Sequence, residues 1–402
     1  MDIVVGTFNT PSLYILRFTP PSPLGPATFK VLSHQHAVGS HSWLALSPAK
    51  NVLYCTAWTE PPSIVAYAVS PSSAATSQDT ASVEGAAPQL TLINSATIAS
   101  RSGYVAVHPA GKYLYSAGGP SGEVFTLRDD GGIGDCIQRL AFLEQDVTTS
   151  QGLPHGDFGG LRHGAHSVDL SPDGRYLYVA DIGRNCIWTY TVNESVHTTS
   201  NEHLISGGKH IAPRHNDGPR HTTPHPNGKV LYSLQEHSSM VDAFHVGDDG
   251  VTLQHCSGVK IIPQEKAPED YWADEVRLST SCGRSGRPKY IYASTRGLKD
   301  DVKGYVAAIA IDEGGQLGQT LHIWETPTSG GWANAVEPAP AYAYGDSSDG
   351  DDTREWIALT DSQEGYVFIL AFDGTHIEEV ARVKLEAENS GEVISAATAI
   401  WL

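Results

Sequence analysis

A single short pattern recurs along the whole chain: an apolar strand, a tight turn, and a return strand rich in tyrosine and leucine. Its clearest copy spans residues 165–181, where Val168 and Leu170 alternate with polar neighbours, as in a strand. Ser-Pro-Asp-Gly at 171–174 then supplies turn residues, and strand formers at 176–179 begin the return. Each copy is therefore predicted to be an antiparallel β-hairpin.

The spacing of the copies indicates how they are assembled. Further copies lie at 41–54, 103–115, 220–232, 273–292 and 334–359. The turn prolines Pro48, Pro109, Pro172 and Pro226 are separated by 61, 63 and 54 residues (109 − 48, 172 − 109 and 226 − 172). A repeat of about 40–60 residues built from several short strands is typical of a β-propeller blade.

The two ends of the chain provide the missing blade. Strand-like segments at 3–6, 13–18 and 29–32 have no hairpin of their own, and 396–402 reads as one more innermost strand. Joining them removes two exposed sheet edges. The predicted fold is all-β: a single domain over 1–402, a seven-bladed β-propeller of four-stranded blades whose N- and C-terminal strands share one blade.

The composition of the chain limits the kinds of molecule it is expected to bind and the compartment in which it is expected to lie. The formal charge of −19 argues against nucleic acid. No run of about 18 apolar residues indicates a membrane-spanning helix. The N-terminus lacks a secretory pattern, and the five cysteines show no metal-type spacing, so a cytoplasmic location with reduced thiols is expected. A local group of cations can still bind a small anion within an acidic protein.

Candidate site residues follow from the hairpin geometry. The start of a blade's first strand and the end of its second lie at the same mouth of the central channel. These positions hold the four principal candidates, His166, Arg220, Glu236 and Arg296. The planar fork of arginine suits carboxylates, so two arginines with a histidine and a glutamate indicate an anion site with an acid–base group.

Other polar residues near this mouth have competing interpretations. Asp181 and Asp361 are expected to bond turn amides, and Asn334 lies nearby. His41 and His221 reach the mouth only if the strand register is right, because a shift of one residue reverses the face. Glu236 is expected to neutralise Arg220, a structural role that is compatible with a role in catalysis. The Gly- and His-rich segment 151–163, with Arg162 and His163 after its glycines, is expected over the face that bears His166.

The chain resembles the fungal 3-carboxy-cis,cis-muconate lactonizing enzymes, within the lactonase-type seven-bladed propellers. The resemblance covers nearly the whole chain and is most specific at Pro-Arg 219–220, Leu-Gln-Glu 234–236, Ala-Ser-Thr-Arg 293–296, Pro-Thr-Ser-Gly-Gly 327–331, Asn-Ala-Val 334–336, Thr-Asp-Ser-Gln-Glu-Gly 360–365 and Ala-Ile-Trp 399–401. The family's proposed catalytic and substrate-binding residues fall on His166, Arg220, Glu236 and Arg296.

The resemblance implies a cycloisomerase that needs no metal or other cofactor. The expected reaction converts 3-carboxy-cis,cis-muconate into a carboxymuconolactone, in the protocatechuate branch of aromatic catabolism (the β-ketoadipate pathway). Relatives form homo-oligomers, so self-association is a further expectation. Either His166 or Glu236 is a candidate proton donor, and the sequence does not choose between them.

Two other functions remain open at this point. A sugar-lactone hydrolase of the 6-phosphogluconolactonase type would use the same cations to hold a phosphate and a base to activate water. A non-catalytic propeller would bind a protein on one face. The convergent Arg, His and Glu set favours a small-molecule site over the scaffold.

Overall fold

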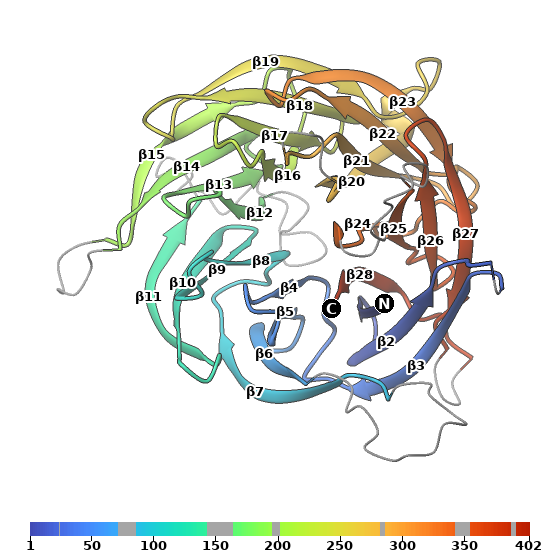
Figure 1. Cartoon of the computed structure of the whole chain (residues 1–402). Helices are drawn as coiled ribbons and strands as arrows, with labels where there is room; N and C mark the ends of the chain where they lie inside the picture. Colours follow the sequence, from blue (N-terminus) through green and yellow to red (C-terminus); the bar gives the residue numbers. More distant parts are fainter. Residues whose placement is uncertain are drawn as a thin grey trace.

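The computed structural model describes residues 1–23, 25–70, 86–142, 164–194, 202–281, 286–341, 354–386 and 391–402. Within these ranges the strands form seven four-stranded antiparallel sheets arranged in a ring around a central channel (Figure 1). The segment 151–163, with Arg162 and His163, lies outside the described residues. The predicted seven-bladed propeller is confirmed.

In six of the seven blades the innermost strand comes first and the strands run outward in chain order. The first three blades comprise β4 (Leu44–Leu46), β5 (Val52–Ala57), β6 (Ser63–Ser70) and β7 (Gln89–Thr97); β8 (Tyr104–Val107), β9 (Tyr113–Gly118), β10 (Ser121–Leu127) and β11 (Ile133–Ala141); and β12 (Ala165–Leu170), β13 (Tyr176–Asp181), β14 (Cys186–Val192) and β15 (Leu204–Ile211).

The next three blades comprise β16 (Pro219–Pro224), β17 (Val230–Gln235), β18 (Met240–Val246) and β19 (Leu253–Lys260); β20 (Tyr271–Leu278), β21 (Tyr290–Gly297), β22 (Tyr305–Ile311) and β23 (Leu317–Glu325); and β24 (Val336–Pro338), β25 (Glu355–Thr360), β26 (Tyr366–Phe372) and β27 (Ile377–Lys384). The short 3₁₀ helix η2 (Pro268–Asp270) precedes β20.

The last blade joins both ends of the chain. It contains β28 (Ala396–Trp401), β1 (Asp2–Thr7), β2 (Ser12–Thr19) and β3 (Thr28–His36). Ile3 of β1 lies opposite Trp401 of β28 in antiparallel register, as the predicted ring closure requires. The ring is therefore closed by main-chain hydrogen bonds between its termini: β1 has a neighbour on each side, and β28 is the innermost strand of the blade.

The predicted turn chemistry forms the hairpin of the third blade. Gly174 adopts φ +73°, which glycine adopts without a Cβ penalty, and its N–H donates to the Ser171 carbonyl at 2.8 Å. The Asp173 carboxylate accepts hydrogen bonds from the Ser171 hydroxyl and the Arg175 amide. These local bonds set the register that pairs Val168 with Val179.

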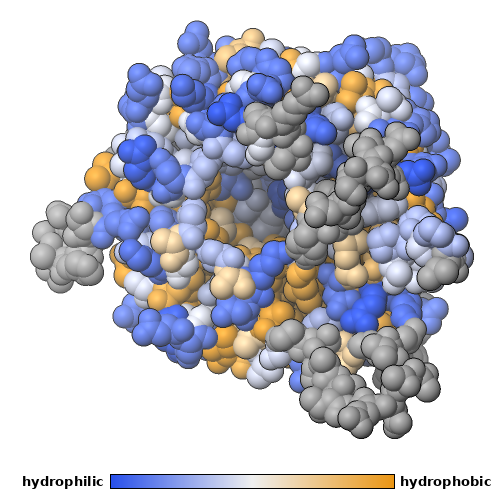
Figure 2. Space-filling view, in the orientation of Figure 1, coloured by the Kyte–Doolittle hydropathy of each residue, from blue (hydrophilic) through white to orange (hydrophobic). Residues whose placement is uncertain are grey.

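The middle strands of each blade are sandwiched between neighbouring blades. All six residues of β5, β17 and β25 are buried, which explains why they read as nearly continuous apolar runs. Adjacent blades pack through these faces, as where Leu234 of β17 meets Ala273 and Val276 of β20 in one apolar cluster. The space-filling view shows the ring hollowed at its centre (Figure 2). Within the described ranges, no helix has the length and apolar character to cross a bilayer.

Candidate active site

Three consecutive blades carry the same irregularity in their innermost strand. The β12–β13 pairing skips from Ala165 to Ser167, so His166 is an extra, unpaired residue. The β16–β17 pairing leaves out Arg220 in the same way, and the β20–β21 pairing leaves out Asp274. An unpaired residue of this kind is a β-bulge, which redirects the side chain and is common beside active sites. The bulges bring these three side chains into one cavity at the channel.

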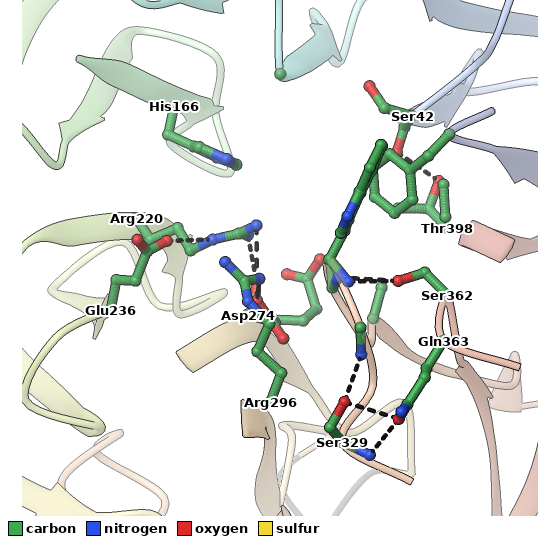
Figure 3. A pocket seen from close by; sticks show the side chains of 18 of the residues that line it. Ser42, His166, Arg220, Glu236, Asp274, Arg296, Ser329, Ser362, Gln363 and Thr398 are labelled. Atoms are coloured by element: carbon green, nitrogen blue, oxygen red, sulfur yellow. Dashed lines mark hydrogen bonds and ion pairs between the residues drawn. The ribbon is translucent and has the colours of Figure 1, made fainter. Parts of the chain in front are cut away.

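The cavity has a volume of about 540 Å³, which suits a small organic molecule. All four principal candidates from the sequence, His166, Arg220, Glu236 and Arg296, line it. Figure 3 shows them on one side of the cavity, with Ser362 and Gln363 on the opposite wall. The structure thus brings the predicted set together from three blades.

The two arginines converge on one carboxylate. Arg220 Nε donates to Glu236 Oε2 at 2.7 Å, and Arg220 Nη1 donates to the Asp274 main-chain oxygen at 2.5 Å. Arg296 Nη1 donates to the Asp274 carboxylate (Figure 3), and Arg220 Nη2 lies 3.8 Å from Oδ1 of the same carboxylate. The Arg296 guanidinium lies 5.1 Å from the Trp272 ring centre. Both arginines are only 7% exposed, so their positions are fixed before any ligand binds.

Asp274 makes this arrangement possible. It is buried beneath the two guanidinium groups, and its second carboxylate oxygen accepts the Asn334 amide at 3.1 Å. Burial raises the pKa of Asp274 to about 6, although Arg296 and Arg220 both oppose the rise. The negative charge of Asp274 reduces the repulsion between the two adjacent guanidinium groups, so both can face the same ligand.

A chain of hydrogen-bonded side chains extends from His166 along the buried wall of the cavity. His166 Nδ1 lies 3.2 Å from His221 Nε2, and His221 Nδ1 lies 2.8 Å from Glu275 Oε1. Burial, followed by the charges of Arg220, His221 and Arg296, holds the pKa of His166 well below its usual value. In the empty cavity His166 is therefore neutral near pH 7.

The opposite wall is shaped by a glycine-rich loop. Gly331 adopts φ +69°, and a Cβ there would lie 2.7 Å from both the Gln363 nitrogen and the Ser362 hydroxyl, so glycine is required. The Ser362 hydroxyl accepts the Trp332 amide at 2.6 Å. The exposed Trp332 ring then packs at the cavity rim near Phe8, at 5.9 Å between ring centres. The wall opposite the charged groups thus combines uncharged polar side chains with the aromatic rings of Trp332 and Phe8.

The other candidates fall into two groups. His221 contacts the cavity, while Asp361 accepts turn amides and Asp181 accepts the Arg184 amide, as predicted. Asn334 is buried outside the cavity lining. His41 also lies away from the cavity: its ring is fully buried, with Nδ1 2.7 Å from the Thr56 carbonyl and Nε2 2.9 Å from the Tyr67 hydroxyl. The register therefore assigns His221 to the cavity and His41 to the protein interior.

His41 is expected to make the fold sensitive to acid. Burial lowers its pKa to about 4, against 6.5 in the unfolded chain, so the unfolded state binds the extra proton between these values. The stabilisation is complete above pH 6.5 and is lost as pH falls towards 4, by about 3 kcal/mol for one group. The stability advantage of the native chain over His41→Gln should shrink between pH 7 and pH 4.5 in calorimetric unfolding. An advantage that stays constant with pH would contradict this assignment.

The sequence interpretation missed Asp274 and Glu275. They lie in a strand that was recognised, but neither was singled out. One signal was available: His166, Arg220 and Asp274 are each separated by 54 residues (220 − 166 and 274 − 220). Positions that repeat with the blade occupy equivalent places around the channel. The regular spacing therefore placed Asp274 beside the two predicted residues.

The channel of this propeller holds two buried arginines, a histidine and compensating carboxylates in one cavity, an arrangement whose charge and size suit a small anionic molecule. Residues 3–332 match the family model described as "Lactonase, 7-bladed beta-propeller". The chain belongs to this family.

Named relatives and a solved structure resemble the chain along most of its length. It is 40% identical to "Muconate cycloisomerase 1" of Cutaneotrichosporon cutaneum, over 100% of this chain and 98% of that protein. It is 29% identical to "Carboxy-cis,cis-muconate cyclase" of Neurospora crassa, over 70% of this chain and 66% of that protein. A solved structure described as a putative 6-phosphogluconolactonase from Bacteroides fragilis superimposes with a TM-score of 0.72 at 20% identity, covering 100% and 97% of the two chains, which shows a shared fold.

Proposed function

We propose that the protein is a cofactor-independent cycloisomerase that closes a cis,cis-muconate into a lactone, with 3-carboxy-cis,cis-muconate as its substrate and a carboxymuconolactone as its product. Such a reaction belongs to the protocatechuate branch of aromatic catabolism. The observation that carries the proposal is the convergence of Arg220 and Arg296 on Asp274 with His166 in the same cavity. The names of two relatives, a muconate cycloisomerase and a carboxymuconate cyclase, support it.

The arginines would bind and orient the substrate. Each guanidinium offers a planar fork that matches a carboxylate, and both forks are held by buried partners. Fixing two substrate carboxylates places a carboxylate oxygen against the carbon–carbon double bond within the same molecule. Intramolecular reactions gain strongly from such positioning.

The bond changes balance without an added reactant. A carbon–oxygen bond forms, and the π electron pair moves to the neighbouring carbon and into the carboxylate attached to it. The arginine that holds this carboxylate stabilises the developing charge. A proton drawn from water through a general acid then adds to the carbon. The ionised substrate thus takes up one proton, and the lactone is an isomer of the fully protonated acid.

His166 is the proposed proton donor. Its pKa is depressed in the empty cavity partly by neighbouring cations, so a bound polycarboxylate would raise it again and favour the imidazolium. The Glu236 carboxylate is already engaged by Arg220 at 2.7 Å and is 2% exposed, which suits a residue that positions Arg220. The proposal therefore gives the proton to His166 and a supporting role to Glu236.

The direct test is an absorbance assay with purified protein, a chelator, and either 3-carboxy-cis,cis-muconate or cis,cis-muconate. We expect loss of the conjugated diene absorbance, faster with the tricarboxylate, and unaffected by the chelator. A faster reaction with the dicarboxylate would correct the substrate. No reaction with either would overturn the cycloisomerase, and hydrolysis of 6-phosphogluconolactone would then identify a sugar lactonase. If none of these anions raises the thermal unfolding temperature, a non-catalytic, protein-binding propeller becomes the favoured interpretation.

A further inference from the structure

Behind His166 lies a buried pair that the proposed reaction does not touch directly. His221 and Glu275 are each 1% exposed, although both border the cavity. His221 Nε2 faces His166 Nδ1 at 3.2 Å, and it also faces Arg220 Nη1 at 3.1 Å. Its other nitrogen, Nδ1, lies 2.8 Å from Glu275 Oε1. The pair therefore connects His166 to a carboxylate through one imidazole ring.

Arg220 and Glu275 together set the direction of the hydrogen bonds in this chain. A guanidinium has donors only, so His221 Nε2 must accept from Arg220 Nη1 and carries no proton. A neutral His221 then carries its proton on Nδ1 and donates it to Glu275 Oε1. His221 Nε2 has no proton to give, so His166 Nδ1 is the donor in the remaining contact and shares the single lone pair of His221 Nε2 with Arg220.

Glu275 is surrounded by donors that suit a carboxylate. Its Oε1 accepts the Val276 amide at 3.0 Å and lies 2.9 Å from Arg277 Nη1, in addition to His221. Arg277 is itself held by Glu337, with Nε 2.8 Å from Oε2. The charged or titratable groups around the two histidines are Arg220, Arg277, Arg296 and Glu275. The acceptor at the end of the chain is thus fixed by three donors.

The His221 ring is also held by packing. The rings of Trp43 and Tyr104 meet it edge-on, with ring centres 5.2 and 5.3 Å away. A ring confined in this way cannot rotate to exchange its two nitrogens without displacing its neighbours. The hydrogen-bond direction is therefore built into the packed interior.

We propose that Glu275 and His221 are positioning residues that fix His166 in the tautomer with the proton on Nδ1, so that Nε2 is the nitrogen that exchanges the proton with the substrate. Figure 3 shows the His166 ring directed towards the cavity. The tautomer follows from the contacts alone, whereas its catalytic consequence rests on the proposed function. An imidazolium that gives up its Nε2 proton would return directly to the tautomer that His221 stabilises.

The primary test is nuclear magnetic resonance of protein labelled with ¹⁵N in histidine, with His166 identified by its absence in His166→Gln. We expect an unprotonated Nε2 and a protonated Nδ1 at pH 8. His221→Phe keeps an aromatic ring against the stacked rings of Trp43 and Tyr104 but removes the acceptor, and should shift His166 towards the Nε2-protonated form. The matched control is His225→Gln, which changes a buried histidine outside the cavity and should leave the His166 signals unchanged.

A second pair of variants tests Glu275. Glu275→Gln keeps a carbonyl acceptor for His221 Nδ1 and should retain the His166 tautomer, whereas Glu275→Leu should lose it. Where the protein turns over a muconate, His221→Phe should lower kcat by about 10²-fold with little change in KM. Native protein with a protonated Nε2, or an unchanged tautomer in folded His221→Phe, would overturn the proposal. If the spectra are as predicted but the protein acts on neither muconate, the positioning role of His221 and Glu275 is upheld and the proposed function is rejected.

Discussion

Replacing Arg296 by methionine is expected to lower kcat/KM for lactone formation by about 10³-fold. Arg296 is nearly buried, and its guanidinium is fixed between the Asp274 carboxylate and the Trp272 ring. Methionine approximates the length of the aliphatic stem but removes both the charge and the fork. The loss should appear in kcat as well as KM, because the charge on the substrate carboxylate grows as the new bond forms.

Steady-state kinetics on folded variants would measure this effect, with thermal unfolding as the check on folding. Arg175→Met is the matched control, because Arg175 also pairs with an aspartate, Asp173, but at an exposed site. It should change kcat/KM by less than about twofold, since exposed ion pairs contribute little. Arg296→Lys should fall between, because it keeps the charge without the planar fork. Near-native kinetics in Arg296→Met would remove Arg296 from the site.

Replacing His166 by glutamine is expected to lower kcat by about 10³-fold and to slow deuterium incorporation into the lactone by the same factor. Glutamine retains a polar side chain of similar reach but cannot deliver a proton at neutral pH. The measurement is product formation in deuterated water, followed by mass spectrometry of the lactone. The residual rate of the variant should lose the pH dependence that His166 gives the native protein, so the decrease should be largest at low pH, where the native His166 is an imidazolium, and smaller at high pH.

Glu236→Gln provides the contrast within the same cavity. The amide oxygen can still accept the Arg220 Nε hydrogen bond, so the expected loss in kcat is about tenfold, from a weaker hold on Arg220. Deuterium should still enter the product at the rate of turnover. If Glu236→Gln blocks incorporation while His166→Gln retains it, the two roles must be exchanged.

The architecture was predictable because the turn residues and the alternating apolar residues of each repeated hairpin set the register in which its two strands pair. Val168 and Leu170 alternate before Ser-Pro-Asp-Gly, and the structure pairs the strands through that turn. Ring closure was predictable for the same reason: both termini contain a strand without a local partner, and Ile3 pairs with Trp401. These features depend on short-range pattern and strand count, which are visible in the chain.

The site was predictable in part. His166, Arg220, Glu236 and Arg296 lie at ends of strands that the hairpin pattern located, and all four line one cavity. Their distances, partners and burial were not predictable. The sequence also left open whether His41 and His221 reach the cavity. Both lie near the start of a blade's first strand, and a shift of one residue in strand register decides whether the ring faces the cavity.

The amino-acid order was enough to establish a closed seven-bladed ring, the mouth at which cations gather, and the strand ends that carry them. The bulges at His166, Arg220 and Asp274, the carboxylate shared by two arginines, and the imidazole chain to Glu275 emerged only from the folded ring. The physical reason is that the repeated hairpin specifies only which neighbouring strands pair. The direction of a side chain at a β-bulge, and the partner that neutralises a buried charge, depend on side chains from other blades.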